Sequence, residues 1–391
     1  MRSLPSRSGR GVLVCIASGL LIASAALPAA AQSSPESKDM ALLGAHDLQA
    51  RSAYQPTIHL QGGRWIAYIG HHGGTKAVPK PVNPLTKMPE FNGTSILDVT
   101  DPRHPKYLFH VPGDEGLAEA GGAQMVRVCD GKTLPKGDPN AVYMLRTFGN
   151  SAHEIWNVAD PANPRRVTTL GGIKGTHKNW WECDTGIAYL VSGVPGWRVD
   201  RMTEVWDLSD PAKPVKIRDF GLPGQQPGTA GRAPTRLHGA ISTGPKGNRI
   251  YFAYGTNEGG ILQIVDREKL LKGPREPTEE NLLYPQVGRL DMSPLTGAHT
   301  TFPVLGMPIA EFAKDKVGKV RNFVVVTNEQ IKNECLEPRQ FVWFVDVTIE
   351  RSPASVSTWG VPEASGGFCS RGGRFGTHAS TRASRTSTTG V

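Results

Sequence analysis

The sequence predicts an all-β fold, a β-propeller of four-stranded blades with five complete blades and an incomplete sixth closed from both termini. Three observations support this prediction. The 391-residue chain contains 45 glycines and 31 prolines, and only 20% of its residues are charged. This composition suits short strands joined by tight turns. Alternating apolar runs recur along the chain, and several of them end in the same proline-containing stop.

The N-terminal residues 1–31 read as a signal peptide. Arg2, Arg7 and Arg10 precede an apolar run over residues 11–27, and three alanines follow at residues 29–31. A basic region, a short apolar run and a small-residue cleavage site are typical of export. We therefore expect a periplasmic or secreted protein without a permanent membrane span, in which residues 41–380 form the propeller domain.

Three segments share one pattern, an alternating apolar run followed by Asp-Pro, two residues and Pro. They are SILDVTDPRHP (95–105), EIWNVADPANP (154–164) and EVWDLSDPAKP (204–214). Alternation predicts a half-buried strand. Proline cannot donate to the next rung of a sheet, and the aspartate can close a turn with its side chain. Residues 261–269 and 341–353 are weaker copies of the pattern.

Another apolar run precedes each copy, and a short strand follows each stop. Each unit therefore contains four predicted strands, repeated about every 50 to 80 residues, as expected for propeller blades. The five units start near residues 56, 121, 175, 236 and 297.

This repeat pattern resembles the LVIVD-repeat family of bacterial exported β-propellers, over roughly residues 40–380. The resemblance implies the architecture and leaves the activity open, because a fold alone does not specify a function.

The two ends are expected to supply parts of the sixth blade. Residues 41–49 read as its outer strand, and residues 374–380 read as the start of its inner strand. Residues 381–391 lack strong strand formers, so we expect a disordered or truncated C-terminal tail there.

Histidines recur in the first predicted strand of the units, which would line a central tunnel. The five candidates for metal ligands are His59, His177, His238, His299 and His378. The second unit lacks a histidine, and an alignment that superimposes Cys129 on Cys183 places Ala123 at this position. Neutral imidazole binds zinc, copper, iron or nickel. The histidines predict either a transition-metal site, with copper or iron favoured and zinc as the third choice, or a polar tunnel lining.

Two carboxylates, Glu258 and Glu329, each follow a Thr-Asn pair near the end of a later strand. They are candidates for catalytic residues, as proton carriers or as partners that orient the histidines. The alternative interpretation is an ordinary turn at a strand end.

Four cysteines follow the predicted signal peptide, none of them in a C-x-x-C motif. In an exported chain they are expected to form disulfides. Sequence alone allows three pairings, of which we favour Cys335–Cys369 together with Cys129–Cys183.

Two functions fit these features. The first is an exported propeller that binds a transition metal in a histidine-lined tunnel, with oxidation of a small molecule as the activity if it is an enzyme. The second is a non-catalytic scaffold of the cell envelope that binds another protein. The formal net charge is +9. No basic stripe interleaved with aromatic residues occurs, so nucleic-acid binding is not expected.

Overall fold

The computed structural model describes residues 41–256, 259–309, 319–332, 336–360 and 377–378. The chain divides into a segment Met1–Leu42 and a unit Leu43–Val391, and the helices and strands of the described residues lie in the second. The predicted signal peptide, residues 381–391, Glu258, Cys335 and Cys369 fall outside the described residues. No helix within the described ranges is long and apolar enough to cross a membrane.

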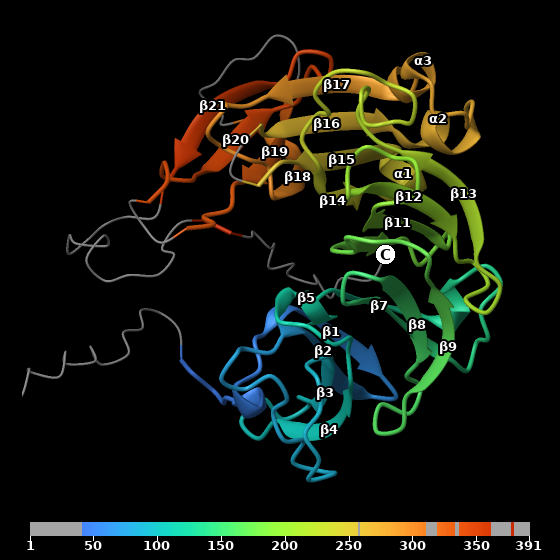
Figure 1. Ribbon diagram of the computed structural model, residues 1–391, viewed down its shortest axis with the longest axis vertical. Coiled ribbons are helices and arrows are strands. Elements are labelled where there is room, and N and C mark those ends of the chain that lie inside the picture. Colours follow the sequence, from blue (N-terminus) through green and yellow to red (C-terminus); the bar gives the residue numbers. More distant parts are fainter. Residues whose placement is uncertain (1–40, 257–258, 310–318, 333–335, 361–376, 379–391) are drawn as a thin grey trace, which may run out of the picture. The chain divides into compact units, whose positions relative to one another are not determined.

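The predicted all-β character is confirmed, and the described ranges form five antiparallel sheets in chain order (Figure 1). Sheet one contains β1 (Tyr54–Gln61), β2 (Arg64–Gly73), β3 (Thr94–Asp98) and β4 (Lys106–Val111), and β5 (Ala118–Ala123) pairs with β2. Sheet two contains β6 (Val126–Asp130), β7 (Val142–Phe148), β8 (Ala152–Asn157) and β9 (Arg165–Leu170).

The three remaining sheets repeat the four-strand order. Sheet three contains β10 (Asn179–Trp181), β11 (Ile187–Ser192), β12 (Met202–Asp207) and β13 (Val215–Phe220). Sheet four contains β14 (Leu237–Ser242), β15 (Arg249–Tyr254), β16 (Ile261–Asp266) and β17 (Gln286–Asp291). Sheet five contains β18 (Thr300–Pro308), β19 (Val320–Thr327), β20 (Val342–Asp346) and β21 (Ala354–Trp359).

Helices are short and lie between strands. They are the 3₁₀ helices η1 (Leu48–Ala50) and η2 (Gly131–Thr133), and the α-helices α1 (Gly244–Gly247), α2 (Arg267–Lys272) and α3 (Glu279–Leu283). In α2 the Asp266 side chain accepts a hydrogen bond from the N–H of Lys269, which caps the helix N-terminus.

The third strand of each repeat ends as the sequence predicts. The side chains of Asp98, Asn157 and Asp207 each accept a hydrogen bond from the N–H two residues later, at 2.8–2.9 Å. The aspartate of each following Asp-Pro makes the same turn, for example from the N–H of Ala212 to Asp210 at 3.0 Å. These local bonds satisfy backbone donors just where proline prevents the ladder from continuing.

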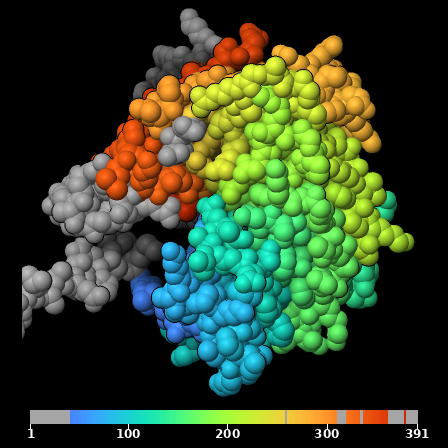
Figure 2. Space-filling view, viewed as in Figure 1, coloured from blue at the N-terminus to red at the C-terminus, as the bar shows by residue number. Residues whose placement is uncertain are grey.

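Consecutive sheets pack against each other through apolar clusters. Sheets one and two share a cluster that includes Ile66 and Met144, and sheets three and four share one that includes Val205 and Phe252. Further clusters join sheet two to three and sheet four to five. In the space-filling view of Figure 2, segments of neighbouring colour accordingly lie next to one another. The first strands also touch in sequence order, β1 to β6, β6 to β10, β10 to β14 and β14 to β18.

The two predicted pieces of a sixth blade do not form strands in the described part of the chain. Residues 41–47 have no regular structure, and η1 follows them. Left-handed backbone at Leu48, Gln49 and Ala50, with φ of 51–58°, is incompatible with an extended strand. Near the other end, Thr377 and His378 lie outside any strand.

Candidate metal centre

Three of the predicted histidines occupy one equivalent position in their sheets. In these three sheets the pairing of the third strand with the fourth is irregular at an equivalent point, just before Trp206, Val265 and Val345. These residues pair in the second strand with Ala188, Ile250 and Val324 and so give a common reference. Counting back four residues from Trp181, Ser242 and Pro303, which pair with Ala188, Ile250 and Val324, leads to the histidines. They are His177, His238 and His299, and all three are at most 2% exposed. Their common register brings them together even though sixty-one residues separate each from the next.

The three imidazoles contact one another in sequence order. The Nε2 atoms of His177 and His238 are 2.8 Å apart, and their ring centroids are 4.4 Å apart. The rings of His238 and His299 follow at a centroid distance of 3.9 Å. The predicted convergence of inner-strand histidines is therefore present for these three residues.

Glu329 and His378 complete the cluster. Glu329 follows β19 and is 3% exposed. Its Oε2 atom lies 3.6 Å from His238 Nε2 and 4.0 Å from His299 Nε2, and its Oε1 atom lies 3.3 Å from His378 Nε2. The His378 side chain is 44% exposed, and its ring centroid is 4.7 Å from that of His299. The cluster thus consists of four buried residues, His177, His238, His299 and Glu329, and one partly exposed histidine, His378.

Backbone and side-chain hydrogen bonds position His378. The N–H of Gln330 donates to the Thr377 carbonyl at 3.0 Å. The Thr377 hydroxyl donates to the carbonyls of Asn328 and Phe341, each at 3.1 Å. These bonds hold the residue before His378 against the end of β19, next to Glu329.

Hydrogen bonds also determine which nitrogen of His238 is available. The Gln124 amide nitrogen donates to His177 Nδ1 at 2.8 Å, so His177 carries its proton on Nε2 and donates to His238 Nε2. Nδ1 of His238 then donates to the His299 carbonyl at 3.0 Å. Nε2 of His238 is thus an acceptor, as it is in a metal ligand held through Nδ1–H to a carbonyl. Here it accepts the N–H of His177, and a metal ion would replace that hydrogen bond.

Burial is the main cause of the shifted pKa values in the cluster. It lowers the pKa of His177, His238 and His299 well below the ordinary 6.5, and nearby positive charges, including Lys178, lower it further. The imidazoles are therefore neutral at physiological pH, which is the form that binds metals. Burial also lowers the pKa of Lys178 to about 7, while the Glu329 carboxylate opposes this shift.

His238, His299 and Glu329 form a buried group that could hold a metal ion. One ligand atom from each residue lies within 4.8 Å of the others. Ligands at about 2.0–2.2 Å from a zinc ion lie roughly 3–3.5 Å apart, so small side-chain movements would complete the coordination. The set combines two imidazoles with one carboxylate, and His177 and His378 lie next to it.

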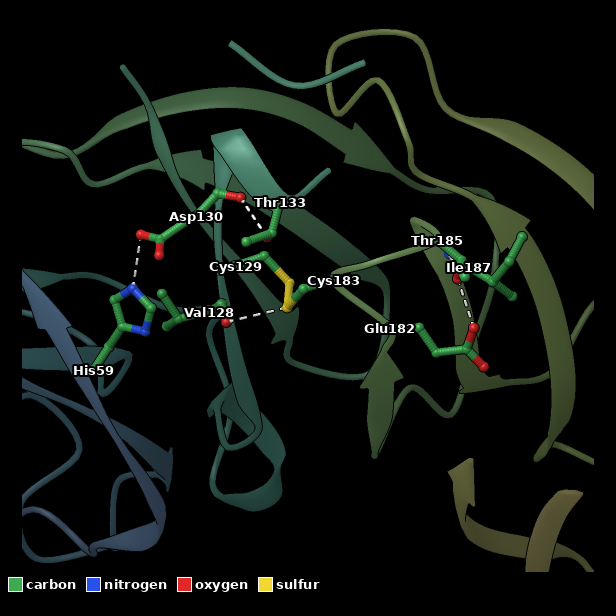
Figure 3. The surroundings of a disulfide bond; sticks show 9 residues. All are labelled: His59, Val128, Cys129, Asp130, Thr133, Glu182, Cys183, Thr185 and Ile187. Carbon is green, nitrogen blue, oxygen red and sulfur yellow. Dashed lines mark hydrogen bonds and ion pairs between the residues drawn. A yellow bond between two sulfur atoms is a disulfide. The ribbon is translucent and has the colours of Figure 1, made fainter. Parts of the chain in front are cut away.

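His59 does not belong to this cluster, contrary to the prediction. Its Nε2 atom lies 3.0 Å from Asp130 Oδ1, and its side chain is 20% exposed (Figure 3). His59 pairs with Ile66 near the β1–β2 hairpin, five residues beyond the position equivalent to His238. Tyr54 occupies that position and lies 6.0 Å from the His378 ring. The histidine of sheet one therefore does not occupy the strand position that the other three histidines share.

Gln124, and not Ala123, is the equivalent residue in sheet two. Cys129 pairs with Tyr143, and the matching pair in sheet three is Glu182 with Ile187, so superimposing Cys129 on Cys183 shifts the alignment by one residue. Only the strand pairing identifies Gln124, and the sequence does not reveal that pairing. Lys178 was also missed, although its place directly after His177 puts it beside the cluster.

The predicted disulfide between Cys129 and Cys183 is confirmed, with Cα atoms 5.4 Å apart (Figure 3). It joins sheets two and three near the hairpin end of their first strands. Residues 335 and 369 of the other predicted pair lie outside the described ranges.

No family model matches the sequence, and no curated protein matches it. Among solved structures, the chain is similar to Sqt1 from Chaetomium thermophilum, with 9% identity, a TM-score of 0.40 and coverage of 78% of this chain and 72% of that one. It is also similar to a candidate 6-phosphogluconolactonase from Bacteroides fragilis, with 11% identity, a TM-score of 0.37 and coverage of 75% and 81%. The third is RS223-Beta-xylosidase, with 12% identity, a TM-score of 0.32 and coverage of 72% and 88%.

Proposed function

We propose that the protein is an exported β-propeller that binds a transition metal through His238, His299 and Glu329. The convergence of these three buried side chains carries the proposal. The first strands, which contact one another in order, would line the tunnel of the propeller. The repeated strand stops that resemble the LVIVD-repeat family, and a disulfide suited to an oxidising compartment, support the architecture and the export.

The donor set favours iron or copper, with zinc as the third choice. Two histidines and one carboxylate are the ligands typical of non-haem iron sites that react with oxygen. Addition of His177 would give three imidazoles, which suit copper. We therefore propose oxidation of a small molecule, with dioxygen as the electron acceptor, as the class of activity. In this proposal Glu329 is a ligand, and it neutralises part of the metal charge.

Metal analysis of the protein purified from the periplasm without an affinity tag tests the proposal. We expect about one equivalent of metal in the wild type and a loss of most of it in a His299→Ala, Glu329→Ala double variant. His104→Ala is the matched control, because His104 is an exposed histidine in a turn. Metal far below stoichiometry in the wild type, unchanged in the double variant, would contradict the metal site and leave the non-catalytic scaffold.

A further inference from the structure

A pocket of about 390 Å³ lies beside the histidine cluster. His299 and Lys178 line it, so one wall is shared with the candidate metal centre. Its volume falls in the range of about 300–1,000 Å³ that small-molecule sites occupy. The apolar side chains that line it include Pro56 of β1, Met125 just before β6, and Trp180, Ala240, Ile241 and Phe302 of sheets three to five.

Lys178 is a buried cation in this pocket. The residue is 6% exposed. Its Nζ atom reaches Thr300 Oγ1 and the ring nitrogens of His299 only at 3.4 Å. Within the described residues, no carboxylate lies within 4.0 Å of this ammonium group. A buried ammonium without a counter-ion is costly, and binding of an anion would remove that cost.

Arg127 is a second cation that lines the same pocket. Its guanidinium group lies 5.0 Å from the centre of the Trp180 ring. Nη1 donates to the carbonyl of Val126 at 3.3 Å, and the buried Nε atom has no hydrogen-bond partner among the residues that the structure describes. Arg127 thus retains donors for a ligand, and Trp180 holds the guanidinium in place by a cation–π contact.

We propose that this pocket binds a small organic acid, with its carboxylate between Lys178 and Arg127 and its apolar body against Trp180 and Phe302. The two cations supply charge-assisted hydrogen bonds, and the apolar side chains supply the contact surface. No aspartate or glutamate lines the pocket as the structure describes it, so nothing there opposes an anion.

The pocket also bears on the substrate of the proposed metal site, and this part rests on the proposed function. Because His299 belongs to both, a bound acid would lie beside the metal. A divalent ion next to Lys178, with Glu329 as the one carboxylate among the three candidate ligands, leaves an excess of positive charge that an anionic substrate would offset. The small molecule would then be an organic acid.

Titration of the mature protein with benzoate, followed by NMR or calorimetry, tests the proposal. Benzamide is the neutral probe of the same shape. We expect benzoate to bind at least about 10-fold more tightly than benzamide, because a hydrogen bond to a charged group contributes more than a neutral one. Lys178→Met should weaken benzoate about 10- to 100-fold and leave benzamide nearly unchanged. Lys174→Met, an exposed lysine four residues earlier, should bind benzoate as the wild type does.

Equal affinities for benzoate and benzamide, or benzoate binding that Lys178→Met does not change, would overturn the proposal. If Lys178→Met does not fold, Arg127→Gln carries the same test, with an expected loss of about 10-fold. All titrations are repeated after removal of metal by a chelator, and metal content is measured in every sample. Benzoate binding in metal-free protein supports the acid pocket even if the protein proves to bind no metal. Stoichiometric metal without benzoate binding rejects the pocket and leaves the metal site standing.

Discussion

His238 and His59 both lie in the first strand of a sheet, yet their surroundings differ. His238 is 2% exposed, its Nδ1 atom donates to a backbone carbonyl, and its Nε2 atom faces Glu329. His59 lies near a hairpin, partly exposed, with its Nε2 atom bonded to Asp130. The two histidines thus lie at opposite ends of equivalent strands, His238 at the cluster and His59 at the hairpin. The comparison teaches that register within the strand, and not recurrence in the sequence, decides which histidines meet.

The largest expected effect separates these two histidines directly. His238→Ala should remove most of the bound metal, because it deletes the candidate ligand whose Nδ1–H is held by a backbone carbonyl. His59→Ala should retain wild-type metal content, since His59 lies outside the cluster. Metal analysis of the two purified variants makes the comparison. Equal loss in both would show that the distinction drawn from the structure is wrong.

Removal of the disulfide tests whether the hairpin end of the first strands affects the metal site at their other end. Cys129 and Cys183 are separated by 54 residues, a loop for which removal of the bond is expected to cost about 4 kcal/mol of unfolding free energy. Denaturant unfolding of a Cys129→Ala, Cys183→Ala variant measures this loss. The metal content of the folded variant should not change. A loss of metal at full secondary structure would instead couple the hairpin end to the cluster.

His153 in β8 provides a buried histidine away from the cluster. Burial lowers its pKa to about 4, and the Glu204 charge opposes this shift. Between pH 6.5 and about 4 the unfolded chain binds a proton that the folded protein does not, so stability falls as the pH falls. The shift corresponds to about 3 kcal/mol. His153→Gln should flatten the dependence of unfolding free energy on pH in this window, measured by denaturant unfolding. An unchanged slope would count against burial as the cause.

The smallest expected effect concerns Gln124, which sets the proton position of His177. With a carboxylate at this position, His177 would carry its proton on Nδ1 and offer Nε2 as a further ligand. Gln124→Glu should therefore raise metal affinity, and Gln124→Leu should not. Changes to groups that orient ligands are typically about 10- to 100-fold in affinity. Competition with a chelator of known affinity measures the difference, and equal affinities of the two variants would exclude this role.

The sequence predicted the strands better than the site. Asp-Pro stops and alternating runs depend on neighbours in the chain, and turns such as that at Asp207 formed as expected. The register of the first strands depends on pairing between strands, where β1 has an irregularity between Tyr54 and Thr57. His177, His238 and His299 were found because their strands keep a common spacing, whereas His59 was misplaced because the sequence does not reveal which residue pairs with Ile66.

Lys178 shows a second limit of sequence reasoning. Its burial depends on residues distant in sequence, such as Gly239 of sheet four and Thr300 of sheet five, and no local pattern marks a lysine as enclosed. The outer strand predicted over residues 41–49 did not form either, and the backbone there is left-handed at Leu48, Gln49 and Ala50. Nothing in the residue types of this segment marks such a turn.

The hydrogen bonds of Thr377 attach His378, the exposed histidine of the cluster, to sheet five independently of the buried ligands. Asn328, Gln330 and Phe341 hold Thr377, and through it His378, on sheet five. Displacement of Thr377 and His378 would remove an imidazole from Glu329 without breaking a strand-to-strand hydrogen bond in any of the five sheets. Access to the buried ligands could therefore be altered at the chain's late residues alone, while the body that positions those ligands stays intact.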